Sequence, residues 1–285
     1  MKKVMARFLI FFIGIPFFTG LVIFLPYRNH LCINILVVLT SALGAIEFQN
    51  ILKQKNLVIP LRQAAFLGGL CPALITAAVS FNFSILGISA VFMAVISWLI
   101  LSGIFASVQK QSAFINRTAA GFSLILYPSF FIVWIIPMSL LPNSSILIVL
   151  YLLTVFLNDS SAWAVGMLFG NGNRGFIPAS PSKSIAGFAA GIFVSLVVGL
   201  AGAKLFPLVF VPRFIPLIPA GAFLGLITGI AATLGDLGES VLKRSAGIKD
   251  SGFLIPGRGG ILDSIDSLTL AAPVYYLVYR LLFRS

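Results

Sequence analysis

Residues 146–169 read ILIVLYLLTVFLNDSSAWAVGMLF, and this stretch decides the class of fold. It is apolar over most of its length and does not alternate apolar and polar residues as a strand of a membrane barrel does. A helix crosses the hydrocarbon core of a bilayer with about 20 mostly apolar residues. The stretch therefore predicts a membrane-spanning helix.

Similar apolar runs recur along the chain and predict an all-α integral membrane protein with about nine transmembrane helices. The runs lie at residues 8–26, 31–48, 64–80, 84–106, 119–141, 146–169, 185–203, 214–234 and 268–283. The composition agrees, because 59% of the 285 residues are hydrophobic, against an apolar share of about 45–50% in soluble domains. The first run lacks the cleavage site of a signal peptide, so we expect it to stay as the first span.

The formal net charge of the chain is +12. With nine spans, most of its 19 Lys and Arg residues fall on the same side of the membrane as the N-terminus. In a soluble protein such a charge suggests nucleic-acid binding, but here the basic residues lie in short loops beside apolar runs, where they set orientation. We therefore expect a cytoplasmic N-terminus, the lipid bilayer as surroundings and no nucleic-acid partner.

Cysteine and histidine offer no recognisable site. Cys32 and Cys71 lie in apolar runs, without a CxxC motif or a histidine at ligand spacing. His30 is the only histidine of the chain, and we interpret it as incidental. A Ser-His-Asp or Cys-His arrangement cannot be assembled, which argues against hydrolysis through an acyl-enzyme.

The seven acidic residues are Glu47, Asp159, Asp236, Glu239, Asp250, Asp263 and Asp266. All fall toward the cytoplasmic ends of their predicted segments, and acids contribute little to orientation, so we interpret them as part of a site. This divides the chain into a scaffold, residues 1–145, and a catalytic part, residues 146–285, with cytoplasmic loops at 170–184 and 236–267. We expect carboxylates from three segments, Asp159, Asp236 and Asp263, to converge around one divalent cation.

The sequence LGDLGESVLKR follows the eighth apolar run. If that helix continues, four polar residues share one face: Asp236, Ser240, Lys243 and Arg244. A carboxylate beside a hydroxyl and two cations suggests a metal ligand next to a phosphate clamp. The alternative is a solvated helix end with an ion pair between Glu239 and Lys243, and the segment alone leaves both open.

The next motif, IPGRGGILDSID, joins glycines to two carboxylates at the start of the last span. Gly259 and Gly260, next to Arg258, would let backbone N–H groups approach a phosphate closely. Asp263 and Asp266 lie three residues apart on the first helical turn. Carboxylate oxygens suit Mg²⁺, which takes further ligands from water and substrate phosphates. The alternative is a pair of acids that stabilises the helix dipole.

Asp159 lies inside an apolar run, where an ionisable residue is a functional candidate by default. The loop that follows offers cations and hydroxyls for an anionic group: Arg174, Ser180, Lys183 and Ser184. The spacing of a Walker phosphate loop is absent. The alternative is a polar turn whose serine caps the next helix. Glu47, at the end of the second run, is interpreted as an interfacial anchor.

Residues 240–266, SVLKRSAGIKDSGFLIPGRGGILDSID, closely resemble the signature of the phosphatidate cytidylyltransferase family, also called CDP-diacylglycerol synthases. The segments Asp159-Ser-Ser-Ala and Ser180-Pro-x-Lys183-Ser184 are similar to a second family block, and Glu47-Phe48 resembles a short family element. The resemblance implies a nine-span enzyme that uses Mg²⁺ to transfer CMP from CTP to phosphatidic acid. It would release pyrophosphate and form CDP-diacylglycerol in a bacterial cytoplasmic membrane.

The resemblance also implies roles for individual residues. The implied metal ligands are Asp236, Asp263 and Asp266, which with Lys243 and Arg244 form the implied catalytic set. The implied substrate-binding residues are Asp159, Ser180, Lys183, Ser184, Ser240, Lys249, Arg258, Gly259 and Gly260. The chain departs from the family pattern at three positions: Arg258 stands where His is usual, Ser264 where Arg is usual, and Ala186 where Glu is usual.

The phosphatidate oxygen is already ionised, so the reaction needs fixed cations and in-line positioning more than a strong base. Arg258 could bind phosphate but could not act as a base. Three alternatives stay open at this point: a CTP-dependent enzyme acting on another lipid, a non-catalytic homologue, and an ion-coupled transporter that uses Asp159. Assembly as a homodimer is also among the expectations.

Overall fold

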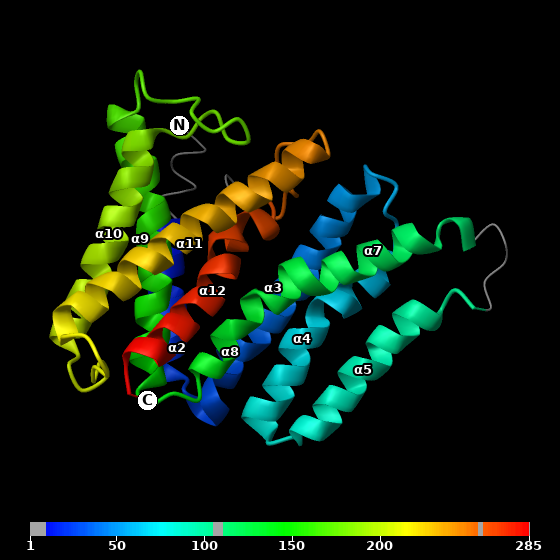
Figure 1. Ribbon diagram of the computed structural model, residues 1–285, viewed down its shortest axis with the longest axis horizontal. Coiled ribbons are helices and arrows are strands. Elements are labelled where there is room, and N and C mark those ends of the chain that lie inside the picture. Colours follow the sequence, from blue (N-terminus) through cyan, green and yellow to red (C-terminus); the bar gives the residue numbers. More distant parts are fainter. Residues whose placement is uncertain (1–9, 105–110, 256–258, 285) are drawn as a thin grey trace.

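The computed structural model describes residues 10–104, 111–255 and 259–284, and within these residues all regular secondary structure is helical (Figure 1). In chain order the helices are η1 (Ile10–Gly14), α2 (Ile15–Phe24), α3 (Tyr27–Lys53), α4 (Leu61–Phe81), α5 (Ile85–Leu101), α7 (Phe114–Ile125), η2 (Leu126–Phe130), η3 (Ile132–Trp134), α8 (Ile135–Met138), α9 (Ser144–Phe169), α10 (Ile185–Leu205), α11 (Leu217–Ser245) and α12 (Leu262–Leu282). The predicted all-α class is therefore confirmed.

Six helical segments of the described chain are long and apolar enough to cross a membrane. They are α3, α4, the combined segment Phe114–Met138, α9, α10 and α11. Two shorter apolar helices, Phe12–Phe24 and Ile85–Leu101, accompany them. Helix α12 has a similar length, but Asp263 and Asp266 lie near its start and much of it is buried. The structure is that of an integral membrane helix bundle.

Two helix boundaries near the predicted site differ from the expected ones. Helix α11 continues beyond Leu234 to Ser245, and α12 begins at Leu262, so the expected loop 236–267 shrinks to residues 246–261. Both extensions are polar on the face that carries the acids, so a search for continuous apolar runs does not find them. The continuation of α11 does place the four polar residues of the LGDLGESVLKR segment on one helix, as predicted.

The fifth predicted run is interrupted rather than continuous. Pro128 lies in the π-helix η2, and Pro137 lies in the short helix α8. Proline has no backbone N–H and its ring crowds the preceding turn, which favours a kink or a change of helix type at these positions.

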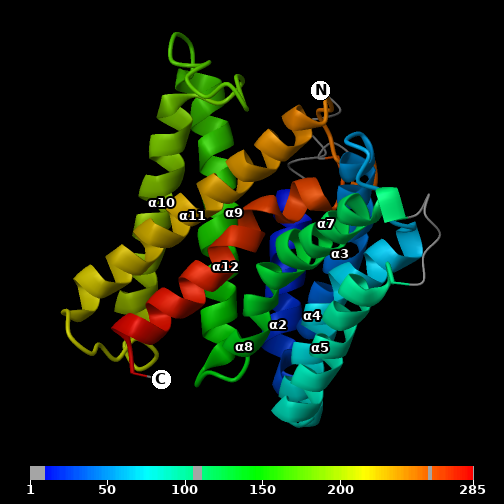
Figure 2. The ribbon, with the colours of Figure 1, turned by 45° about the vertical axis from the view of Figure 1, so that its right-hand side comes forward.

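The helices form two groups that meet at α12 (Figures 1 and 2). Helices α9, α10, α11 and α12 pack on one another in that order, while α3, α4, α5 and α7 make up the other group. Helix α12 contacts α11 and α9 on one side and α3 and η3 on the other. Loops 170–184 and 246–261 lie at the same end of the bundle, the upper end in both views.

Helices α10 and α11 meet backbone to backbone because glycines line their contact. A Cβ atom at Gly225 would lie 2.2 Å from the carbonyl oxygen of Ser195, and one at Gly199 would lie 2.3 Å from that of Gly221. Small residues spaced four apart allow membrane helices to approach this closely and to gain dispersion contacts along their length. The position of α11, which carries much of the site, is thereby fixed against α10.

A buried asparagine ties three of these helices together below the acidic cluster. Asn158 of α9 donates to Ser195 Oγ of α10 at 2.9 Å and to the carbonyl oxygen of Gly229 of α11 at 3.3 Å. The hydroxyl of Tyr151 donates to the carbonyl oxygen of Leu268 of α12 at 2.6 Å. These bonds set the depth of the neighbouring residue Asp159 relative to α11 and α12.

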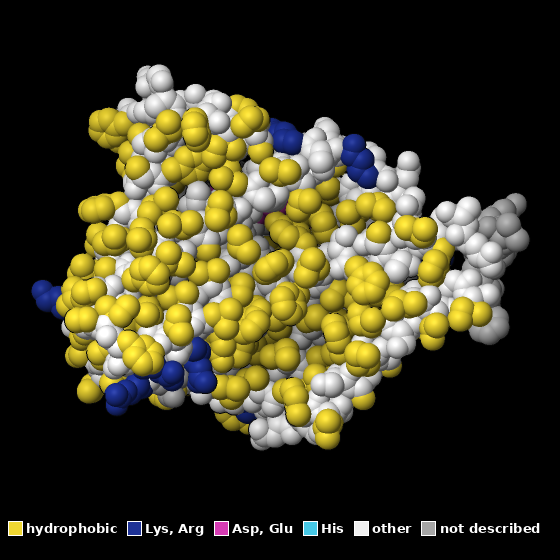
Figure 3. All heavy atoms as spheres, viewed as in Figure 1, with side chains coloured by type: hydrophobic (Ala, Val, Ile, Leu, Met, Phe, Trp, Pro, Cys, Tyr) yellow, Lys and Arg dark blue, Asp and Glu magenta, His cyan; other side chains and the backbone are white. Residues whose placement is uncertain are grey.

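The surface in Figure 3 fits a lipid-facing role. Hydrophobic side chains cover most of this face, while Lys and Arg side chains lie toward its edges, and acidic atoms are visible only inside a hollow. Charges are therefore kept away from the apolar flank and gather at the ends of the bundle and inside it.

Two Gly→Ala substitutions in α11 test the close contact with α10. Gly225→Ala should lower the melting temperature in detergent micelles, because its Cβ overlaps the Ser195 carbonyl and forces the helices apart at a cost of about 1–3 kcal/mol. Gly238→Ala is the matched control, since a Cβ there meets open space. It should be neutral or stabilising by about 0.5–1 kcal/mol. Equal melting temperatures for the two variants would contradict this account.

Candidate active site

A cavity of about 1100 Å³ extends between α2, α3, α9, α11 and α12 and reaches loops 170–184 and 246–261. Its two ends differ in chemistry. The end between α2, α3 and the first half of α9 is lined by apolar side chains, among them Phe18, Ile33, Val37, Ile148, Leu152 and Phe156. The end beneath the two loops is lined by carboxylates, cations and hydroxyls. One continuous space therefore has an apolar part and a charged part.

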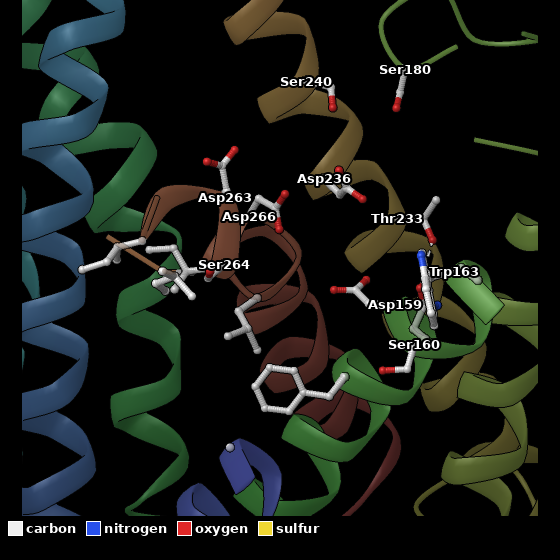
Figure 4. A pocket seen from close by; sticks show the side chains of 18 of the residues that line it. Asp159, Ser160, Trp163, Ser180, Thr233, Asp236, Ser240, Asp263, Ser264 and Asp266 are labelled. Carbon is white, nitrogen blue, oxygen red and sulfur yellow. Dashed lines mark hydrogen bonds between the residues drawn. The ribbon is translucent and has the colours of Figure 1, made fainter. Parts of the chain in front are cut away.

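Four of the predicted acids surround the charged part (Figure 4). They are Asp159 from α9, Asp236 from α11, and Asp263 and Asp266 from α12. The hydroxyl of Ser267 lies between two of them, 3.1 Å from Asp159 Oδ1 and 3.3 Å from Asp266 Oδ1. The sequence therefore correctly placed these acids in one region, although they come from three separate helices.

Lys183 of loop 170–184 forms an ion pair with Asp236 of α11. Both side chains are about one quarter exposed, so the pair borders the cavity without being fully solvated. The Lys183 ammonium also lies 5.7 Å from the ring centre of Phe188, within the range of a cation–π contact. The pair holds the loop against α11 at the mouth of the cavity.

Lys243 is buried between two carboxylates. Its ammonium lies 2.5 Å from Glu239 Oε2, one helical turn away on α11, and 2.5 Å from Asp263 Oδ1 on α12. The predicted pair of Glu239 and Lys243 therefore exists, but it is buried rather than at a solvated helix end. Because the Glu239 side chain is fully buried, removing Lys243 would leave an uncompensated charge, which is strongly destabilising.

The second oxygen of Asp263 is held by loop 246–261. Oδ2 accepts hydrogen bonds from the backbone N–H groups of Ser251 at 2.9 Å and Gly260 at 2.8 Å, and the Ser251 hydroxyl lies 2.8 Å away. Gly259 has a φ of +113°, and a Cβ there would lie 2.5 Å from this oxygen. The glycines predicted to approach a phosphate thus give room to a carboxylate of the protein, and the Gly260 N–H is already donated to it.

Glu47 is not an interfacial anchor, because it is buried, at 4% exposure, and bound to the same loop. Its carboxylate accepts hydrogen bonds from the N–H groups of Ile261 at 3.0 Å and Leu262 at 2.8 Å. The Ser251 hydroxyl lies 3.0 Å from Glu47 Oε2. Sequence reasoning placed this residue in the scaffold half. The available signal was an acid inside an apolar run, the same signal that identified Asp159.

The other predicted residues divide into groups. Ser180, Ser240, Arg244 and Lys249 line the cavity, and Ser180 and Ser240 are buried. Arg244 is exposed and donates to the carbonyl oxygens of Ala179 at 3.4 Å and Ile248 at 3.2 Å. Its side chain thus connects the two loops.

Ser184 also lines the cavity, but its hydroxyl accepts the N–H of Gly187 at 3.1 Å and caps α10, as the alternative interpretation expected. Of the three departures from the family pattern, Ser264 lines the cavity and Ala186 lies in the first turn of α10. Arg258 lies outside the described residues.

The expected convergence of Asp159, Asp236 and Asp263 around one divalent cation is not found. Within residues 10–104, 111–255 and 259–284, no three Asp, Glu, His or Cys side chains lie close enough to hold an ion. The donor chemistry nevertheless fits a cation that completes its shell with water and phosphate. Glu239 Oε1 is buried without a hydrogen-bond partner among these residues. A buried carboxylate oxygen without a donor is costly unless a proton or a cation compensates it.

Comparison with known proteins agrees with this geometry. The chain is 41% identical over 142 residues to a phosphatidate cytidylyltransferase of Synechocystis, which covers 50% of this chain and 46% of that protein. It is 34% identical over 195 residues to a phosphatidate cytidylyltransferase of Thermotoga maritima, covering 66% and 69%. It is also 32% identical over 199 residues to the uncharacterized protein YnbB of Escherichia coli, covering 66% and 62%.

The match to the first of these relatives spans only about half of that protein's length. The model of the cytidylyltransferase family extends further and matches residues 5–282. The resemblance inferred from residues 240–266 is thereby confirmed. Since the match includes both loops and all the helices around the cavity, the chain belongs to the cytidylyltransferase family.

Proposed function

We propose that the protein transfers CMP from CTP to phosphatidate and so produces CDP-diacylglycerol and pyrophosphate at the cytoplasmic face of the membrane. The observation that carries the proposal is the single cavity with an apolar part and a charged part. Such a space suits a substrate pair of which one member is a lipid and the other a water-soluble polyanion. Family membership and the names of the relatives support the same assignment.

In this reaction an ionised oxygen of phosphatidate attacks the α-phosphorus of CTP. A new oxygen–phosphorus bond forms, the bond from the α-phosphorus to the bridging oxygen of the β-phosphate breaks, and pyrophosphate leaves. Lys183, Lys243, Arg244 and Lys249 border the cavity and would hold the phosphate oxygens of the two polyanions. No base is required, because the attacking oxygen carries no proton that must be removed.

Mg²⁺ is the cofactor we propose, with Asp236, Asp263 and Asp266 as its protein ligands. It would offset the negative charge of the triphosphate and polarise the phosphoryl group under attack. Lys183 pairs with Asp236, and Lys243 pairs with Asp263. Each ammonium thus lies where it could move from its carboxylate to a substrate phosphate. The carboxylate oxygens would then be free to bind Mg²⁺.

The number of spans and the side of the membrane on which the N-terminus lies belong to the same proposal. Nine spans with a cytoplasmic N-terminus would place loops 170–184 and 246–261 in the cytoplasm of a bacterium, where CTP is available. The gathering of Arg174, Lys183, Arg244 and Lys249 on these loops and at the end of α11 supports that orientation. The division into a scaffold, residues 1–145, and a catalytic part, residues 146–285, stays a prediction, as does a homodimer.

The isosteric change Asp236→Asn tests the proposed metal ligand. Purified protein in mixed micelles should form CDP-lipid from labelled CTP and phosphatidate when Mg²⁺ is present and stop when it is chelated. The variant should lose at least about 100-fold in kcat, the loss typical when one group that stabilises the transition state is removed. Its melting temperature should change little, because Asp236 is partly exposed. Undiminished turnover in the variant would rule out the assigned role.

Two lysine substitutions test the phosphate contact at the mouth of the cavity. Lys183→Gln should raise the KM for a phosphate-bearing substrate about tenfold or more, because a hydrogen bond to a charged group contributes about 1.5–3 kcal/mol. Lys204→Gln is the control, since Lys204 is an exposed lysine in the last turn of α10, away from the two loops. Titrating CTP and phosphatidate separately identifies which substrate Lys183 binds. Identical kinetics in the two variants would contradict a role for Lys183.

A further inference from the structure

Glu47 is the one acid of the α2–α8 region, and it reaches the loop that carries the predicted family signature. Its carboxylate accepts the N–H groups of Ile261 and Leu262, which lie more than 200 positions further along the chain. Glu47 is not among the residues that line the cavity. It therefore does not contact a substrate held there, and any influence on the reaction must pass through the residues that it binds.

The hydrogen bonds of Glu47 serve as a cap for α12. The first turn of a helix has N–H groups without partners inside the helix, and the residue at the N-cap, Ile261, has no side-chain oxygen to accept them. Glu47 supplies that acceptor from α3. The positive end of the α12 dipole favours an anion at this place. Among the described residues no Lys or Arg forms an ion pair with Glu47. The negative charge of its carboxylate is therefore stabilised by backbone N–H groups and a hydroxyl.

The loop also closes around the carboxylate from two sides. A Cβ atom at Gly252 would lie 2.5 Å from Glu47 Oε1, and one at Gly260 would lie 2.2 Å from Oε2. A side chain at either position would displace the Glu47 carboxylate from its present hydrogen bonds. These contacts hold Gly252 and Gly260 against α3.

Ser251 connects Glu47 to the proposed metal ligand. Its hydroxyl lies 3.0 Å from Glu47 Oε2 and 2.8 Å from Asp263 Oδ2, and its N–H donates to Asp263. Asp263 in turn holds Lys243. The positions of Asp263 and Lys243 thus depend on the place where Glu47 holds the loop.

We propose that Glu47 is a positioning residue, which caps α12 from a distant helix and holds Ser251, Ile261 and Leu262 so that Asp263 and Lys243 face the substrates. The proposal rests on the transferase function proposed above. It assigns to the first half of the chain a part in the reaction that neither the family match nor the names of the relatives specify.

The test is the isosteric change Glu47→Gln, which removes the charge and turns one acceptor oxygen into an N–H₂ donor that opposes the backbone donors. We expect kcat to fall about 100-fold, the size of effect that a misplacement of about 1 Å produces, while the KM for CTP changes less than about threefold. Gln49→Ala is the matched control. Gln49 is buried on the same helix and donates to the Leu57 carbonyl oxygen, away from the loop, so kcat should remain near that of the parent.

A double-mutant cycle with Ser251→Ala tests the proposed route through Ser251. If Glu47 acts through Ser251, the double variant should lose little more kcat than the Glu47→Gln variant alone. Fully additive losses, or an unchanged kcat in Glu47→Gln, would overturn the positioning role.

Hydrogen–deuterium exchange gives a readout that does not depend on activity. In Glu47→Gln, amides of residues 251–255 and 259–266 should exchange faster, while those of α9 and α10 should match the parent. Unchanged exchange in these two segments, or faster exchange throughout the bundle, would refute a local anchor. A parent protein with no transferase activity would count against the proposed function, whereas the exchange comparison would still decide whether Glu47 holds the loop.

Discussion

The ammonium of Lys243, buried between the carboxylates of Glu239 and Asp263, is the interaction on which the site depends. Burying one of these charges alone would cost several kcal/mol, so the packing of α11 against α12 brings the three groups together. The same compensation recurs where Lys183 meets Asp236 and where backbone N–H groups meet Glu47. Each contact joins two segments, so satisfying the charges also fixes the geometry of the cavity.

The fold was accessible from sequence because bilayer physics leaves few options for long apolar runs. The same reasoning failed where a helix continues into polar sequence, because a search for apolar runs does not detect polar helical turns. The apolar runs end at Leu234 and resume only at Leu268, although α11 and α12 both continue into the polar site. It also gave no weight to Gly225, whose contribution to packing appears only when a second helix lies against it.

The site was predictable to the extent that it follows helical periodicity. Asp236 and Lys243 share one helix, and Asp263 and Asp266 lie near the start of another, so their spacings already suggested a common direction. The partner of each charge could not be read from spacing, because a lysine can pair with any acid that folding brings near. Glycines beside Asp263 suggested a phosphate loop, whereas the space they leave is taken by carboxylates of the protein.

The long separation between Glu47 and its partners has a consequence for biosynthesis. A ribosome makes α3 early, and the amides of Ile261 and Leu262 follow more than 200 residues later. During that interval the carboxylate lacks the donors that it has in the finished bundle. The contacts around Glu47 are therefore completed only when α12 is in place, and a nascent chain that stops before α12 lacks them.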